Sequence, residues 1–124
     1  MIRGMIQIKR VYESAASADG QRFLVDRLWP RGLRKDEVPL KAWLKDIAPS
    51  TELRQWFHQH ADEWAEFERR YVAELKAMPD ESLQPLRDAV EHGKVTLLYG
   101  SKDVDHNNAV VLKEFLEHRH KAKQ

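Results

Sequence analysis

The chain has 124 residues, of which 42% are hydrophobic and 33% are charged, so we expect residues 1–124 to form one globular domain. The absence of cysteine excludes a disulfide framework, a thiol nucleophile and a thiolate zinc site. The 21 basic and 20 acidic residues give a formal net charge of +1, without the strong basic excess that is usual in a dedicated nucleic-acid-binding protein.

Two strands are predicted in the first 30 residues. Residues 5–11 alternate between two sets of side chains, which is typical of a strand with one more apolar face. Residues 23–29 begin with side chains that are apolar on both faces, as in a buried central strand, and Pro30 ends the run because proline cannot donate to a ladder. Residues 30–40 read as a loop, and residues 42–48 fit either a short strand or a turn of helix.

Three helices are predicted in the middle of the chain. Ser50 is a good N-cap for the first helix. Residues 64–78 carry apolar side chains at steps of three and four, a stripe typical of core packing, and we expect this helix to pack on the sheet. Pro79 ends that helix. Ser82 is then expected to cap a third helix, which ends at Gly93.

The last strand and helix complete the pattern. Residues 95–99 form a short, apolar, β-rich run, and a final helix is expected to begin near Asp105. Strands that alternate with helices favour a small α/β fold with a mainly parallel sheet and helices on both faces, a three-layer α/β/α arrangement. We expect the strands at 23–29 and 95–99 to lie centrally in that sheet.

Open parallel sheets bind ligands beyond the carboxyl ends of their strands, and the loop after the second strand is one candidate site. Here Arg27 and Arg31 would clamp a phosphate or carboxylate, and the adjacent Trp29 would stack on a flat ligand. The alternative, which we weight equally, is that Asp26 and Arg27 form structural ion pairs. The candidate partners for those pairs are Lys45, Asp46 and Asp103, and Lys45 is also a candidate ligand-binding residue.

The loop after the strand at 95–99 is the second candidate site. It leads into a helix N-terminus, whose free amides and dipole attract anions. The alternative is that Asp103 or Asp105 caps the helix while Lys102 is solvated, and such a cap does not exclude ligand binding. The glycine content is too low for a dinucleotide-binding fingerprint, so no specific nucleotide is implied. The candidate ligand-binding residues are Tyr99, Ser101, Lys102, Asn107 and Asn108.

Two further kinds of site are not expected. The His-x-His pairs at 58–60 and 118–120 lack the spacing of a third ligand, so we read them as solvated histidines and expect no metal. We expect no cofactor.

No apolar run approaches the about 20 residues needed to span a bilayer, and no secretory leader is visible, so we expect a cytoplasmic protein without membrane contact.

Several strings of residues carry a resemblance to a known family. They are 27–32, 43–50, 53–57 and 96–99, followed by Lys102-Asp103 and Asn108-Ala109. These strings resemble the YeaO-like proteins, which belong to the wider group called domain of unknown function 488. The resemblance covers nearly the whole chain and implies a bacterial protein from a family that has no established activity.

More distant members of that group look like strand-helix-strand proteins with an Asp-x-Arg at a strand end and a late Cys-His-Arg. In this chain Asp26 and Arg31 lie in or near the first feature, whereas 107–109 reads Asn-Asn-Ala where the second would stand. We therefore do not carry the thiol- or histidine-dependent chemistry of those relatives over to this chain.

These observations lead to three hypotheses about function. The leading one is an anion- or phosphate-binding cleft at the strand ends, in its sharpest form a small enzyme acting on a phosphorylated or nucleotide-like ligand. The second is a non-catalytic nucleic-acid-binding protein that uses the basic segment 27–45. The third is a protein-interaction module without a ligand. The sequence leaves the oligomeric state open. The candidate acid–base groups are Asp26, Asp46 and Asp103.

Overall fold

The computed structural model describes residues 5–122, and side chains through residue 118. The strands within this range are β1 (Ile6–Arg10), β2 (Gln21–Leu24), β3 (Ala42–Trp43) and β4 (Val95–Tyr99). The α-helices are α1 (Thr51–Gln59), α2 (Trp64–Ala77), α3 (Asp80–Glu91) and α4 (Asn108–Ala122). Short 3-10 helices occupy Ser17–Asp19, Lys35–Glu37 and Lys45–Ile47.

The four strands form one parallel sheet in the order β1-β4-β2-β3, so β4 and β2 are its central strands, as predicted. All five side chains of β4 are buried, which suits a strand paired on both edges. The predicted strand at 23–29 differs at both ends, because β2 begins at Gln21 and ends at Leu24. Pairing stops soon afterwards because the Gly100 amide, which follows β4, donates to the Asp26 carboxylate and not to a strand carbonyl.

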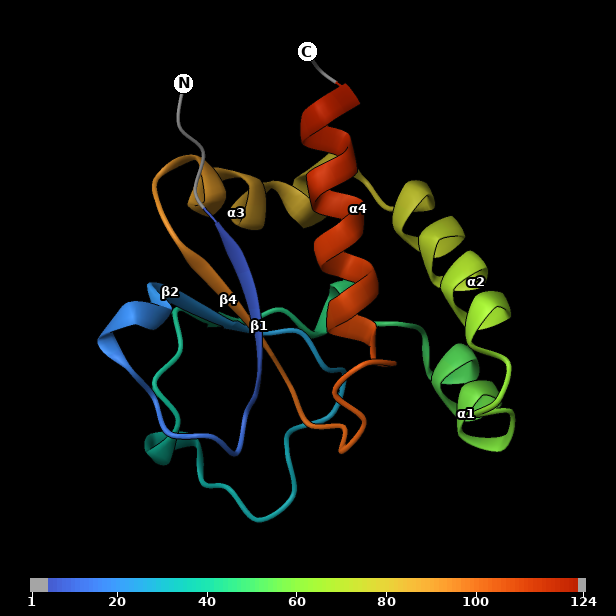
Figure 1. Cartoon of the computed structure of the whole chain (residues 1–124), viewed down its shortest axis with the longest axis horizontal. Helices are drawn as coiled ribbons and strands as arrows, with labels where there is room; N and C mark the ends of the chain where they lie inside the picture. Colours follow the sequence, from blue (N-terminus) through green and yellow to red (C-terminus); the bar gives the residue numbers. More distant parts are fainter. Residues whose placement is uncertain (1–4, 123–124) are drawn as a thin grey trace.

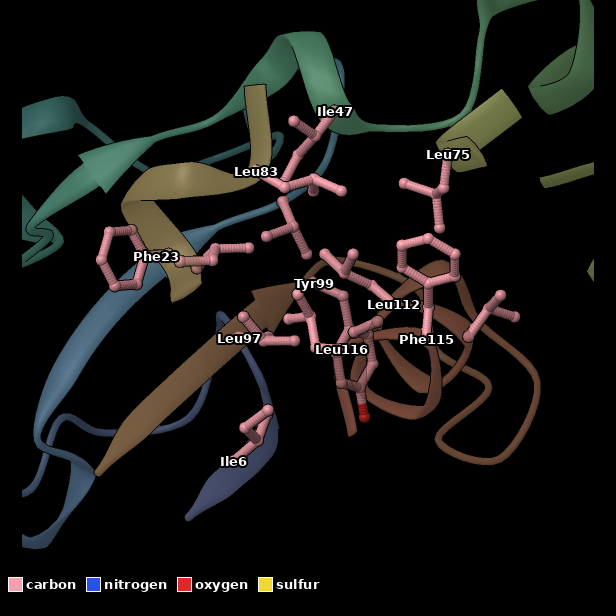
Figure 2. Close-up of a cluster of buried hydrophobic side chains, with 14 of the residues drawn as sticks. Ile6, Phe23, Ile47, Leu75, Leu83, Leu97, Tyr99, Leu112, Phe115 and Leu116 are labelled. Carbon is pink, nitrogen blue, oxygen red and sulfur yellow. The ribbon is translucent and has the colours of Figure 1, made fainter. Parts of the chain in front are cut away.

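The four α-helices share one hydrophobic core with one face of the sheet. Alternate strand residues such as Phe23, Leu97 and Tyr99 point into this core, where Figure 2 shows them beside Leu112 of α4 and Leu83 of α3. Helix α4 contacts β1 and β4, and α2 packs against α4 and α1 (Figure 1). Phe67, Tyr71 and Leu75 of α2 share this core with the strand residues, while the backbone of α2 lies against α4 and α1.

The opposite face of the sheet is covered mainly by the segment between β2 and β3. Leu24 and Leu98 are buried there with Val38, and Trp29 and Trp43 pack around them. The small α/β fold with a parallel sheet is confirmed, and both faces are covered as a parallel sheet requires. The cover on this second face consists of loops and 3-10 turns, where α-helices were expected.

The helix ends show how local sequence sets each boundary. The Ser50 hydroxyl accepts from the Leu53 amide at 3.1 Å, which confirms the predicted cap of α1. Gly93, at a φ of 147°, follows the C-cap of α3, also as predicted. Helix α3 begins at Asp80, however, so Ser82 lies in its first turn and does not cap it. The ambiguous segment 42–48 contains both a two-residue strand and a 3-10 turn.

None of the helices within residues 5–122 has the length and apolar character that spanning a bilayer requires. The amino end of β1 and the carboxyl end of α4 lie on the same side of the molecule (Figure 1). The opposite, carboxyl edge of the sheet is where the loops after β2 and β4 emerge. That edge holds the candidate site.

Candidate functional site

A cavity of about 570 Å³ opens at the carboxyl edge of the sheet. The loops after β2 and β4 both line it, together with α1, α2 and the start of α4, so the two predicted loops meet at one cavity. Ligand crevices of parallel α/β sheets form at this edge. The polar lining residues are Asp26, Arg27, Arg54, His58, Ser101, Lys102, Asp103, His106, Asn107 and Asn108. The apolar ones are Leu28, Pro49, Phe57, Ala61 and Phe67.

Asp26 joins the two loops across the cavity. Its Oδ2 accepts from the Gly100 amide at 2.8 Å, and its Oδ1 accepts from Asn108 Nδ2 at 3.1 Å. Asn108 Nδ2 also donates to the Val25 carbonyl at 2.8 Å, which ties α4 to the end of β2. Burial raises the pKa of Asp26, and the donors on Gly100 and Asn108 and the positive charge of Arg54 oppose that rise only in part.

Arg27 lines the cavity but is largely engaged by the fold. Its Nε donates to the Pro49 carbonyl at 3.0 Å and its Nη2 donates to the Ala48 carbonyl at 3.2 Å. The guanidinium therefore holds the chain that enters α1. Within the described residues, its hydrogen bonds go to backbone carbonyls. The expected alternative to ligand binding was an ion pair with Asp46 or Asp103.

Arg54 is the cationic residue of the cavity that the sequence analysis missed. Its Nε is buried and has no hydrogen-bond partner among the described residues. Its positive charge acts on Asp26, lowering the pKa of that carboxyl. Arg54, Phe57 and His58 follow the spacing i, i+3, i+4, which places them on one face of α1, and Ala61 follows just after the helix. The spacing groups these side chains, but nothing local in the sequence shows that this face of α1 lines the cavity.

The loop between β4 and α4 is organised by hydrogen bonds to its own backbone. Asp103 Oδ1 accepts from the Asp105 and His106 amides, each at 3.0 Å, and these bonds lower the pKa of Asp103. The cap of α4 is Asn107, whose Oδ1 accepts from the Val110 amide at 3.1 Å. The prediction of an aspartate cap near Asp105 was therefore wrong, because Asp103 stabilises the turn before the helix.

The other two candidates in this loop, Ser101 and Lys102, both line the cavity and are exposed. Ser101 Oγ accepts from the Asp103 amide at 3.1 Å, so its hydroxyl hydrogen remains able to donate. Lys102 adds a positive charge to those of Arg27 and Arg54. These two side chains therefore line the same cavity as Arg54, from a different segment of the chain.

Five predicted site residues lie away from the cavity lining. Tyr99 is buried in the core beneath the helices, and burial raises its pKa. Trp29 Nε1 donates to the Leu33 carbonyl at 2.6 Å, and its ring meets Trp43 edge-on with centroids 5.3 Å apart. The remaining three residues, Arg31, Lys45 and Asp46, are exposed. The Arg31 carbonyl accepts a hydrogen bond from the Tyr12 hydroxyl, and Lys45 Nζ lies over the Trp43 ring.

The histidines are placed singly. His60 stacks on Trp56 and its Nδ1 lies 2.8 Å from the Trp56 carbonyl oxygen, whereas His58 lines the cavity. His106 stacks on Trp64 with ring centroids 4.7 Å apart. The described residues contain no group of three or more side chains suited to hold a metal ion. In the predicted pair at 118–120, two of the three side chains lie outside the described ones.

These observations define a small parallel α/β domain with a cavity of mixed charge and aromatic character at the carboxyl edge of its sheet. No solved structure matches the chain. The chain belongs to the DUF488 group, because the family model described as "Inactive DUF488-N3 subclade" matches residues 5–124. The predicted family resemblance is thereby confirmed.

Two curated relatives cover almost the same length. The uncharacterised protein YeaO of Escherichia coli (strain K12) is 46% identical over 111 residues, which cover 90% of this chain and 96% of that protein. The uncharacterised protein Rv3073c of Mycobacterium tuberculosis (strain ATCC 25618 / H37Rv) is 40% identical over 114 residues, which cover 92% of this chain and 95% of that protein.

Proposed function

We propose that this chain is a non-catalytic protein that binds a small anionic ligand in the cavity at the carboxyl edge of its sheet. The observation that carries the proposal is Arg54, a cavity-lining arginine whose buried Nε–H has no partner among the described residues. Buried polar groups are nearly always hydrogen-bonded, and guanidinium groups favour carboxylates and phosphates. An anion in the cavity would therefore pair with the guanidinium group of Arg54.

The surroundings of Arg54 support an anionic ligand with a single charged group. Lys102 and the hydroxyl of Ser101 offer further donors from the opposite loop. Arg27 adds positive charge even though its guanidinium hydrogen bonds go to backbone carbonyls. Asp26 limits the negative charge that the ligand can carry, since a highly charged anion would lie close to the Asp26 carboxylate.

Binding without catalysis is favoured by what happens to the candidate acid–base groups. Asp103 accepts from two backbone amides, Asp46 is exposed away from the cavity, and both oxygens of Asp26 accept hydrogen bonds. Asn107 and Asn108 occupy the place of the cysteine and histidine of distant relatives, and both serve the fold. The description of the subclade as inactive agrees with this interpretation.

The proposal is tested by NMR titration of the protein with inorganic phosphate and with phenyl phosphate. We expect the backbone amides of Gly100 and Asn108 and the side-chain Nε–H of Arg54 to shift on addition of at least one of these anions. Arg54→Gln should weaken that binding about tenfold or more, because it removes the charge that anchors the anion.

Arg34→Gln is the matched control, since Arg34 is exposed and pairs with Asp36 outside the cavity. It should leave the affinity unchanged. The proposal fails if neither anion shifts these signals, or if Arg54→Gln binds as tightly as the parent protein. Tight binding of an oligonucleotide that weakens steeply with salt and ignores Arg54→Gln would also contradict it, and would favour the nucleic-acid hypothesis.

A further inference from the structure

The wall of the cavity beside Arg54 is apolar. Phe57 is half-buried in α1, and its ring stacks on that of Phe67 with centroids 4.3 Å apart and planes 22° apart. Pro49 and Ala61 continue this wall. Leu28, from the loop after β2, also lines the cavity and is 57% exposed. The cavity thus offers both charged groups and apolar contacts to a ligand.

We propose that the ligand is an organic anion, in which one phosphate or carboxylate group meets Arg54 and an aromatic body lies between Phe57 and Leu28. This inference rests on the proposed function and deepens it, because it names the class of ligand. A bare inorganic anion would use only the charged groups of the cavity.

The size of the cavity supports an organic ligand. Its volume of about 570 Å³ falls within the about 300–1,000 Å³ that is usual for small-molecule pockets. An inorganic anion is only a few times larger than a water molecule, whose share of liquid volume is about 30 Å³. Most of the apolar wall would then remain in contact with water, without the gain that burying Phe57 and Leu28 against a ligand provides.

The spacing of the groups sets the shape of that ligand. Arg54 and Phe57 are three residues apart on α1, so their Cβ atoms lie about 5–6 Å apart on the same face. An anionic group attached directly to a ring, as in phenyl phosphate or benzoate, spans this short distance. The nearby carboxylate of Asp26 disfavours a second negative group. The site therefore fits one anionic group and one aromatic body.

The test compares the affinities of inorganic phosphate, pyrophosphate, phenyl phosphate and benzoate by calorimetry or NMR. We expect at least one of the two aromatic anions to bind about tenfold or more tightly than inorganic phosphate, and pyrophosphate to gain nothing. Comparison of phenyl phosphate with benzoate then identifies the anionic group that Arg54 prefers.

Two variants separate the apolar wall from the charge. Phe57→Ala and Leu28→Ser should each weaken the aromatic anion several-fold and leave inorganic phosphate unchanged, and the exposed Leu28 can be replaced without unfolding the protein. Equal affinities for inorganic phosphate and both aromatic anions would overturn this inference while the proposed function stands. If no anion binds, both fail. If Leu28→Ser and a folded Phe57→Ala protein both keep the aromatic preference, the ligand body lies elsewhere and the inference is wrong.

Discussion

Asp19 is a buried carboxylate that sits far from the cavity, on the loop-covered face of the sheet. It is 2% exposed and accepts from Lys9 Nζ at 3.1 Å, from Arg22 Nη1 at 2.5 Å and from the Ala16 amide at 3.1 Å. Burial acts to raise its pKa, but the donors on Ala16, Lys9 and Arg22 outweigh that effect and lower the pKa to about 2.

Asp19 should therefore make the protein sensitive to acid. Because the pKa in the folded state lies below its ordinary value, the carboxylate stabilises the fold above about pH 4, and this contribution is lost as the pH falls towards about 2. Urea unfolding of the parent protein and Asp19→Asn at a series of pH values checks this. The difference in unfolding free energy between the parent protein and Asp19→Asn should shrink over that range. The difference between the parent protein and the exposed control variant Asp36→Asn should not. A constant difference would contradict the assignment.

Gly20 is required by both its backbone angle and its surroundings. Its φ is 66°, and a Cβ built on it would lie 2.2 Å from the Lys94 carbonyl oxygen, so the backbone would have to move. Gly20→Ala should destabilise the protein by clearly more than the about 1–3 kcal/mol of strain alone. Gly32→Ala isolates that strain, because Gly32 has a φ of 85° and nothing within 4 Å of the same position. Thermal unfolding compares the two variants, and equal losses would show that the Lys94 contact is relaxed.

At the scale of elements, α2 contributes an aromatic stripe of unequal burial. Phe67 and Tyr71 are 3% and 0% exposed, and the Tyr71 hydroxyl donates to the Ile47 carbonyl at 2.7 Å, whereas Trp64 is only half-buried beneath His106. Phe67→Ala and Tyr71→Ala should each cost about 3–5 kcal/mol of unfolding free energy. Trp64→Ala should cost less because less of its ring leaves water on folding. Denaturant unfolding measures all three, and a ranking with Trp64→Ala as the largest loss would contradict this picture.

The element boundaries show how tertiary contacts change a local pattern. The strand was predicted to continue through residues 25–29, but the carboxylate of Asp26 accepts from the Gly100 amide and the strand ends at Leu24. Asp105 has a sequence suited to start α4, but Asp103 takes the amides of this turn and Asn107 becomes the cap. Both shifts come from polar side chains whose partners lie on the neighbouring turn or strand.

At the scale of the whole molecule, Asn108 links α4 to β2 beside the cavity. Asn108→Ala would remove the donor to the Val25 carbonyl and to one oxygen of Asp26. The change should cost about 1–3 kcal/mol, the usual loss when buried acceptors lose their partner. It should also raise the pKa of Asp26 further, because this hydrogen bond favours the charged form.

The pKa of Asp26 can be followed through its carboxyl ¹³C signal, and stability through urea unfolding. Asn107→Ala is the comparison, since it removes the helix cap at a cost of about 1 kcal/mol and does not touch Asp26. If the pKa of Asp26 is the same in Asn108→Ala as in the parent protein, the hydrogen bond from Asn108 does not set the pKa of that carboxyl.

The parallel α/β class, the two central strands, the cap at Ser50, the family and the edge of the sheet where the candidate residues gather could all be predicted from the amino-acid sequence. These features follow from apolar periodicity, capping chemistry and a long resemblance, all of which are local in the chain. The tertiary structure decided which charges meet. Arg54 comes from α1, between the two predicted loops in sequence, and no local signal placed it beside Asp26. Likewise, Arg27 donates to backbone carbonyls and Arg31 does not line the cavity, because the partners of a charged side chain depend on distances in the folded chain.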